Sequence, residues 1–203
     1  MNWPIFLYFI IGHFLGDFVF QTNKIVAWKT KAFWGLLPHV SLVYLATLIL
    51  FIPYLNHLSI WLICSINAIL HFGIDRFKIV NEKYYHEIHP QTTRNPLPPY
   101  LFDQLAHLIV IAILSWFIPN NLNITLFESN NWIHFYQRTD LLLYILGIIL
   151  FSYTSDITYF MYQLSKKPVQ YSRSYYAMMK RLVIFALAFL VIWILVRLVW
   201  QIF

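Results

Sequence analysis

Long runs of apolar residues dominate the chain. Shorter stretches, which contain most of the polar residues, separate these runs. A helix that crosses a bilayer needs roughly 20 mainly apolar residues. Six segments meet this criterion, at about 3–22, 36–54, 58–78, 100–118, 141–163 and 181–203. The pattern predicts an all-α fold, that of a polytopic membrane protein built as a bundle of about six transmembrane helices. We expect one transmembrane domain over 1–203, with motif-bearing helices in 3–118 and a C-terminal helix pair in 141–203.

The composition agrees with a membrane protein. The 203 residues are 60% hydrophobic and only 11% charged, whereas a soluble domain carries about 25% charged residues. The first residues lack the basic stretch and the small-residue cleavage site of a signal peptide. Lys and Arg outnumber Asp and Glu by 14 to 8, but in a membrane protein this excess indicates cytoplasmic loops rather than a nucleic-acid partner. The expected partner is therefore the lipid bilayer, and the oligomeric state stays open.

The basic residues predict the orientation of the helices. Lys and Arg gather in the connections after the first, third and fifth segments, and only Arg138 and Arg197 lie elsewhere. Cytoplasmic loops carry the excess of Lys and Arg, so these connections are expected in the cytoplasm and both termini outside. The alternation also favours an even number of helices.

Three of the apolar segments carry a histidine and an aspartate four residues apart. The pairs are His13 with Asp17, His71 with Asp75, and, in reversed order, Asp103 with His107. Residues at i and i+4 lie on one face of a helix, about 6 Å apart along its axis. The third pair lies on a helix that runs in the opposite direction. Its reversed order therefore places Asp103 at the depth of the other two aspartates and His107 at the depth of the other two histidines. We therefore predict a layer of carboxylates and a layer of imidazoles, both in the cytoplasmic half.

Other polar residues are expected near this depth, and they are Gln21, Lys24, His39, Lys78, Gln104 and Asp156. Gln21 continues the stripe of the first pair, and His39 opens the second helix. Asp156 lies in the inner half of the fifth helix, where only local reasoning assigns it a role. Gly12, Gly16 and Gly73 stand beside the motif residues, and small residues allow helix backbones to approach closely.

These residue types point to a metal site. Imidazole nitrogens and carboxylate oxygens are ordinary ligands of zinc, iron and manganese. Several aspartates in a low dielectric repel one another unless a cation or protons neutralise them, and one divalent cation, or two, would do so. The predicted ligands, with zinc favoured over manganese or iron, are His13, Asp17, His71, Asp75, Asp103 and His107.

A metal site of this kind suggests an enzyme, a membrane-embedded metal-dependent hydrolase. It would hydrolyse or transfer a lipid-linked or phosphorylated substrate, because a metal with an open position activates water or polarises a phosphoryl group. An unligated Asp17, Asp75 or His39 would act as the general base. Gln21, Lys24, Lys78 and Gln104 are the predicted substrate-binding residues, with the two lysines holding a phosphate or an anionic lipid headgroup.

Three other interpretations remain open at this point. Chains of Asp and His also form relays in proton- or cation-coupled transporters, although all members of this set lie in the cytoplasmic half. The set could instead be a hydrogen-bonded network that only stabilises the bundle. A non-catalytic scaffold would present the basic stretches 23–35 and 164–180 to a protein or to anionic headgroups.

The order and spacing of these motifs resemble a bacterial membrane family known as domain of unknown function 3307. The resemblance covers about residues 5–118 and rests on the three His/Asp pairs, Gln21, His39, Lys78 and the Asp103-Gln104-x-x-His107 ending. It implies a multi-pass protein of the bacterial cytoplasmic (inner) membrane. The layout is also similar to that of membrane-embedded metal-dependent hydrolases, an analogy of arrangement alone.

Overall fold

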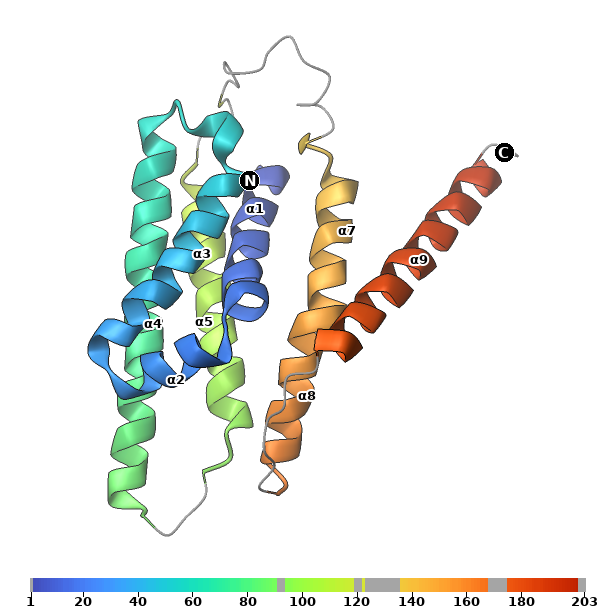
Figure 1. The fold of residues 1–203 in the computed structure, drawn as a ribbon. Coiled ribbons are helices and arrows are strands. Elements are labelled where there is room, and N and C mark those ends of the chain that lie inside the picture. Colours follow the sequence, from blue (N-terminus) through green and yellow to red (C-terminus); the bar gives the residue numbers. More distant parts are fainter. Residues whose placement is uncertain (1, 91–93, 119–121, 123–135, 168–174, 201–203) are drawn as a thin grey trace.

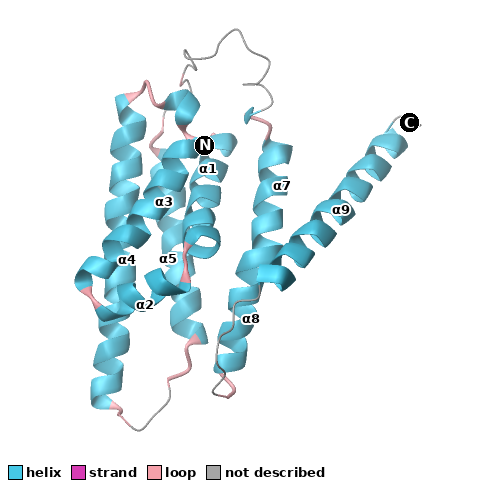
Figure 2. Cartoon of the chain, in the orientation of Figure 1, coloured by secondary structure: helices cyan, strands magenta, loops and turns pink. Residues whose placement is uncertain are grey.

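The computed structural model describes residues 2–90, 94–118, 122, 136–167 and 175–200, and these residues form helices and connecting loops without a strand (Figure 2). The first half of the chain contributes α1 (Trp3–Phe14), the π-helix η1 (Leu15–Phe20), α2 (Asn23–Lys31), η2 (Phe33–Gly35), α3 (Leu36–Leu50) and η3 (Ile52–Tyr54). The second half contributes α4 (Leu58–Ile88), α5 (Leu97–Trp116), α7 (Thr139–Ile149), η4 (Leu150–Thr154), α8 (Ser155–Leu164) and α9 (Tyr175–Trp200).

Six of the described helical stretches are long and apolar enough to cross a membrane. They are Trp3–Phe20, Phe33–Leu50, Leu58–Ile88, Leu97–Trp116, Thr139–Leu164 and Tyr176–Val196. Their number and order follow the apolar pattern, which confirms the all-helical prediction and the six long apolar segments. Residues 201–203, at the end of the sixth predicted segment, lie outside the described residues.

The boundaries differ from the prediction in two places that matter for the site. The first helix ends at Phe20 and not at 22, and the next residue, Gln21, is extended. Thr22 then starts the unpredicted helix α2, because its side chain accepts a hydrogen bond from the Ile25 amide at 3.4 Å. The third membrane-length helix, α4, continues ten residues beyond the predicted end at 78.

Helix α1 occupies the centre of the bundle, where it contacts α3, α5 and α7 (Figure 1). In its membrane-length stretch 67% of the residues are buried, more than in any of the other five. Helix α4 packs against both α3 and α5 and completes the packing around this centre. The three His/Asp pairs lie on α1 with η1, on α4 and on α5, so the bundle brings them to a common interior.

Two glycines, one in α1 and one in η1, let the first helix approach α3 closely. A Cβ atom on Gly12 would lie 2.8 Å from the Cα atom of Thr47, and one on Gly16 would lie 2.6 Å from the Cα atom of Val43. No side chain fits in either position, which confirms the predicted close approach there. The same prediction is wrong for Gly73, where a Cβ atom would meet nothing within 4 Å.

The end of the bundle beyond the histidines is filled mainly with apolar and aromatic side chains, together with the buried but uncharged Thr47, Asn67 and Ser115. Tyr8 donates a hydrogen bond to the Tyr136 carbonyl at 3.0 Å, and Tyr136 donates one to the Leu50 carbonyl at 2.6 Å. The ring of Tyr8 also packs edge-on against Phe51. Burial raises the pKa of the Tyr54 and Tyr136 hydroxyls, so both stay neutral. This end of the interior is therefore packed and uncharged.

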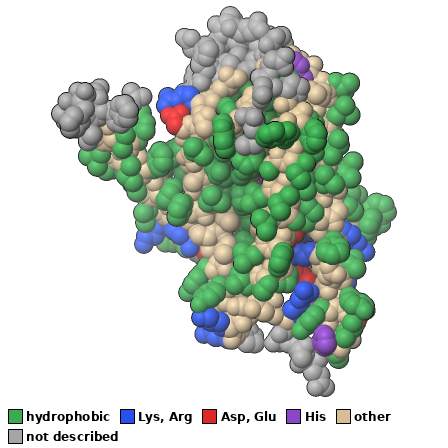
Figure 3. Space-filling view, turned by 180° about the vertical axis from the view of Figure 1, so that it is seen from behind, with side chains coloured by type: hydrophobic (Ala, Val, Ile, Leu, Met, Phe, Trp, Pro, Cys, Tyr) green, Lys and Arg blue, Asp and Glu red, His purple; other side chains and the backbone are tan. Residues whose placement is uncertain are grey.

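Helix α9 packs mainly on the C-terminal part of the bundle, against α7 and η4, and its far end diverges from α7 (Figure 1). Phe185 stacks on Phe151 of η4 with ring centroids 4.3 Å apart, and Phe189 packs on Tyr144 of α7 at 4.5 Å. Many other apolar side chains of α9 are exposed. Apolar side chains also cover the middle of the face in Figure 3, where most of the visible Lys and Arg gather in the lower half.

Candidate metal centre

Four α-helices and one π-helix position the site. His13 lies in the last turn of α1, and Asp17 lies in the π-helix that follows; π-helical turns are rare and often occur at functional sites. His71 and Asp75 lie near the middle of α4, and Asp103 and His107 lie on α5. His39 lies in the first turns of α3. All seven side chains are buried, with exposed fractions of 0% to 7%.

The three motif histidines form one layer. The ring of His71 stacks on that of His107 with centroids 4.1 Å apart, and His13 lies 4.8 Å from His107 and 5.3 Å from His71. One nitrogen of each ring lies within 4.8 Å of the other two. The structure thus contains the imidazole layer that the reversed spacing predicts. The ligand roles of these residues stay predictions.

His39 lies between two of the carboxylates. Its Nε2 atom is 3.0 Å from Oδ2 of Asp75, 3.3 Å from Oδ1 of Asp17 and 3.1 Å from Nε2 of His71. The His71 Nε2 atom lies 3.5 Å from the same Asp17 oxygen and 3.8 Å from the same Asp75 oxygen. Three ligand-type atoms from η1 and α4 therefore lie within 3.3 Å of the His39 Nε2 atom on α3. The sequence identified His39 only as a candidate base near this depth.

A second group forms around His107. Its Nε2 atom lies 3.7 Å from Oδ1 of Asp103 and 3.7 Å from Oδ1 of Asp75. The ligand atoms of these three residues lie within 4.8 Å of one another. His13 adjoins this group, because its ring centroid is 4.8 Å from that of His107, and its Nε2 atom lies 3.8 Å from Oδ2 of Asp17. The carboxylates and imidazoles thus converge and are not separate pairs on separate helices.

Several atoms at the centre find no hydrogen-bond partner among the residues that the structure describes. They are Nε2 of His13 and His107, Oδ1 of Asp17 and Asp103, and Oδ2 of Asp75. Buried polar atoms are nearly always hydrogen-bonded, and leaving one unpaired costs about 1–3 kcal/mol. A network that only stabilised the bundle would pair these atoms. Bound cations would supply the partners that these atoms lack.

Two glutamine side chains orient the surrounding groups. In the amide orientation that satisfies its neighbours, Gln21 accepts from His39 Nδ1 at 3.1 Å and from Lys29 Nζ at 2.8 Å. A proton on Nδ1 leaves Nε2 of His39 with its lone pair toward the carboxylates, as in metal-binding histidines. Gln104 donates to Oδ2 of Asp17 at 3.4 Å and to Oδ2 of Asp103 at 3.2 Å. Both predicted glutamines therefore contact the site.

Two lysines contact the carboxylates from the side of the cluster that faces α2 and the end of α4. Lys78 Nζ lies 3.0 Å from Oδ2 of Asp103, and Lys29 Nζ lies 3.5 Å from Oδ2 of Asp75. Sequence reasoning missed Lys29 and selected Lys24, which is exposed on α2. The sequence did contain a signal for Lys29. Thr22 is a favoured N-cap residue, and a helix that starts after it, over 23–31, turns Lys29 toward α4.

A cavity of about 260 Å³ adjoins the three carboxylates. Its polar lining includes Asp17, Gln21, Asn23, Lys29, Thr30, Asp75, Lys78, Glu82, Asp103 and Gln104, and α8 contributes an apolar wall of Ile157, Phe160 and Met161. A neighbouring cavity of about 450 Å³ shares Glu82 and Met161 and adds the cations Arg94, Lys166 and Lys167. The site is therefore accessible from the side of α2 and α8, opposite the packed aromatic end.

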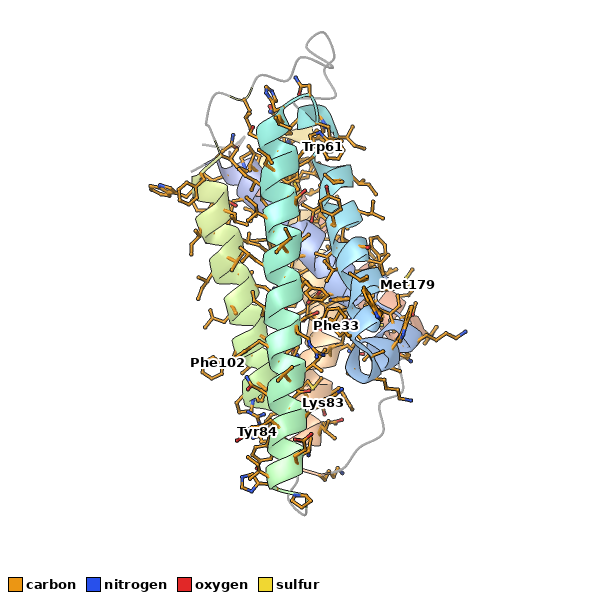
Figure 4. The ribbon with its side chains drawn as sticks, turned by 90° about the vertical axis from the view of Figure 1, so that its left-hand side faces the viewer. Phe33, Trp61, Lys83, Tyr84, Phe102 and Met179 are labelled. Carbon is orange, nitrogen blue, oxygen red and sulfur yellow. The ribbon has the colours of Figure 1, made fainter. Side chains whose placement is uncertain are left out.

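A groove of about 420 Å³ between α4 and α5 reaches one of these carboxylates, Asp103, from the side. Its lining combines Lys78 and Asp103 with the apolar side chains of Phe77 and Phe102. Phe77 and Phe102 are 71% and 72% exposed, and Phe102 projects away from the bundle in Figure 4. The Lys78–Asp103 ion pair thus stands between the cavity and an apolar groove on the outer surface.

Asp156 does not join this cluster. Its carboxylate forms an ion pair with the guanidinium of Arg181 and so connects α8 to α9. Neither residue lines the cavity at the carboxylates. The structure therefore gives Asp156 a partner in the C-terminal pair and not in the His/Asp cluster.

The fold and the cluster define a class of protein: an all-helical chain with several helices that could span a membrane and with buried His/Asp groups that could hold a metal ion. The chain belongs to the family described as protein of unknown function (DUF3307), whose profile matches residues 5–135. The match confirms the family resemblance and extends past residue 118. Searches of curated proteins and of solved structures found no match.

Proposed function

We propose that this protein is a membrane-embedded, divalent-metal-dependent enzyme that hydrolyses or transfers a phosphoryl group of a lipid-linked substrate. The observation that carries the proposal is the convergence of His39, His71, Asp17 and Asp75, whose closest ligand-type atoms are 3.0–3.8 Å apart in the five pairs measured. Tetrahedral ligands at zinc bond lengths of about 2.0–2.2 Å lie about 3.3–3.6 Å from one another. The cluster therefore has the dimensions of a metal site, with zinc as the favoured ion and manganese or iron as alternatives.

The cavity supports an anionic, amphiphilic substrate. Lys29 and Lys78 lie beside the carboxylates. When a metal ion neutralises the aspartates, the ammonium groups of these lysines become available to bind a phosphate. The apolar wall on α8 and the groove with Phe77 and Phe102 suit a hydrocarbon chain. A headgroup phosphate at the lysines and a chain in the groove would thus fit together.

A bound divalent cation would polarise the phosphoryl oxygen and make a coordinated water more acidic. In hydrolysis, the water oxygen bonds to phosphorus and the bond from phosphorus to the alcohol oxygen breaks. The proton lost by water passes through a carboxylate to the leaving alcohol. Asp17 and Asp75 are the candidate bases, because both line the cavity. The position of His39 Nε2 between them favours a ligand role over a base role for this histidine.

For orientation we propose both termini outside a bacterial inner membrane and the cavity open to the cytoplasm. Support comes from the basic residues near the cavity mouth, Arg94, Lys166 and Lys167, because cytoplasmic segments carry the excess of Lys and Arg. These cations also suit the anionic headgroups of the cytoplasmic leaflet.

A transporter fits the described structure less well. Ion passage by a relay would require ionisable groups on both sides of the imidazole layer. The layer is instead followed by tightly packed side chains, including Ile5, Phe9 and Phe51, each 0% exposed. A one-sided cavity with a packed floor is the geometry of a binding or catalytic site.

The test is the metal content of the protein purified in detergent, measured by mass spectrometry before and after chelation. We expect a tightly bound divalent ion, and a loss of thermal stability when the chelator removes it. His71→Asn should lose the ion, because it removes a central ligand, whereas His86→Asn, an exposed histidine on the same helix, should retain it. The loaded protein should release phosphate from a long-chain alkyl phosphate faster than from p-nitrophenyl phosphate.

The absence of a bound ion, with no response of stability to chelation, would overturn the proposal. An ion bound equally by both variants would place the metal elsewhere. If the protein holds the ion but acts on neither phosphate ester, the catalytic part of the proposal is wrong and the metal site remains.

A further inference from the structure

We infer that the cluster holds two divalent cations, with the carboxylates of Asp75 and Asp17 bridging them. The inference rests on the metal-dependent function proposed above and specifies how its site is built. In a two-ion site Asp17 and Asp75 would be ligands and not bases, since a bridging carboxylate has no oxygen left for a proton, and the two cations would make a coordinated water acidic instead. The number of donors already exceeds one ion: four histidines and three aspartates converge, whereas zinc in proteins takes four ligands in structural sites.

The two oxygens of Asp75 face different partners. Its Oδ2 atom lies 3.0 Å from Nε2 of His39 and 3.8 Å from Nε2 of His71. Its Oδ1 atom lies 3.7 Å from Nε2 of His107, which in turn is 3.7 Å from Oδ1 of Asp103. One carboxylate thus offers a donor atom to each of two ligand groups. A carboxylate that chelated one ion would instead turn both of its oxygens toward the same ligand group.

Asp17 is divided in the same way. Its Oδ1 atom lies 3.3 Å from Nε2 of His39 and 3.5 Å from Nε2 of His71. Its Oδ2 atom lies 3.8 Å from Nε2 of His13 and accepts from Gln104. The first ligand group therefore contains His39, His71 and one oxygen from each bridging aspartate. The second contains His13, His107, Asp103 and the other two oxygens.

The atoms without hydrogen bonds fall in both groups. Oδ1 of Asp17 and Oδ2 of Asp75 belong to the first group, and Nε2 of His107 and Oδ1 of Asp103 belong to the second. All four side chains are more than nine-tenths buried. One ion in the first group would leave His107 and Asp103 unsatisfied, whereas two ions would satisfy both groups.

Two cations also suit the chemistry of the proposed substrate. Ions about 3.5–4 Å apart clamp a phosphoryl group and stabilise the attacking and the leaving oxygen together. The cavity reaches Asp17, Asp75 and Asp103 at once, so a phosphate at its floor would contact both ligand groups. We therefore assign phosphate esters or diphosphates as the substrate class of this site.

The experiment counts metal ions per chain in protein purified in detergent, loaded with Mn²⁺ and freed of excess ion. We expect about two Mn²⁺ per wild-type chain, together with the exchange-coupled electron paramagnetic resonance signal of a bridged pair. His39→Gln removes a donor of the first group only, and Asp103→Asn removes one of the second group only. Each should hold about one Mn²⁺ and lose the coupled signal.

Asp156→Asn is the matched control, because Asp156 is a membrane-segment aspartate that pairs with Arg181 outside the cluster. It should keep about two Mn²⁺ per chain and the coupled signal. Size-exclusion chromatography shows whether each variant folds, and the wild-type signal tests the bridge without any substitution.

One uncoupled ion in the wild type would overturn the two-ion inference and leave the proposed metal-dependent function standing. The same conclusion would follow if folded His39→Gln and Asp103→Asn each lost all metal, since the donors would then form one site. A wild-type chain that bound no ion at all would overturn the proposed function itself.

Discussion

A single methyl group on Gly16 should disturb the site without touching a ligand. In Gly16→Ala the new Cβ atom would lie 2.6 Å from the Cα atom of Val43 on α3. Ordinary carbon–carbon contact begins near 3.5 Å, so η1 and α3 must separate by about 0.9 Å or deform. Overpacking of this kind costs about 1–3 kcal/mol of folding free energy.

The displacement falls directly on the metal ligands. Asp17 follows Gly16 in the chain, and its Oδ1 atom lies 3.3 Å from Nε2 of His39 on the opposing helix. Metal–ligand distances tolerate about 0.2 Å, several times less than the separation that the methyl group requires. We expect at least a tenfold loss of metal affinity, which corresponds to about 1.4 kcal/mol.

Gly73→Ala is the matched control. It adds the same methyl group beside the same kind of motif residue, but its Cβ atom would meet nothing within 4 Å. Ala is favoured over Gly within a helix by about 0.5–1 kcal/mol, so stability should hold or rise and metal affinity should not change. Metal titration and thermal unfolding in detergent measure both quantities. Equal behaviour of the two variants would refute the argument that the close approach of η1 to α3 positions Asp17.

Two further predictions concern charges. Lys78→Met removes the cation that bonds Asp103 at 3.0 Å and lines both the cavity and the groove. It should weaken binding of a long-chain alkyl phosphate by about tenfold or more, because a charged hydrogen bond is worth about 1.5–3 kcal/mol. Lys83→Met, an exposed lysine on the same helix (Figure 4), should not change this binding, and similar losses in both variants would exclude Lys78 as the specific contact. Asp156→Asn breaks the partly exposed pair with Arg181 and should cost at most about 1 kcal/mol in thermal unfolding; a larger loss would show that α9 depends on this pair.

The helices and the spacing of the polar motifs follow from the sequence alone. The length of an apolar run and the i, i+4 interval are local properties, so they can be recognised without knowing the neighbours. The reversed order on α5 is equally informative, because antiparallel helices present a sequence pattern in opposite directions. For this reason the amino-acid order is sufficient to predict the imidazole layer of His13, His71 and His107.

Which side chains meet depends on tertiary packing. The position of His39 between two carboxylates depends on how closely α3 packs against α1, which the backbone contacts of Gly12 and Gly16 set. Lys29 reaches Asp75 because the chain leaves its first helix at Gln21 and starts α2. A count of apolar residues over a 20-residue segment does not reveal this change of direction.

The division of the Asp75 oxygens between two ligand groups has the same origin. Rotation of a carboxylate follows the positions of partners on other helices, and no local pattern encodes it. Asp156 shows the converse case: its place in an apolar segment suggested a role at the site, but packing of α8 beside α9 gave it Arg181 instead. Local sequence thus sets which groups are available at a given depth, and packing sets which of them come close enough to share an ion.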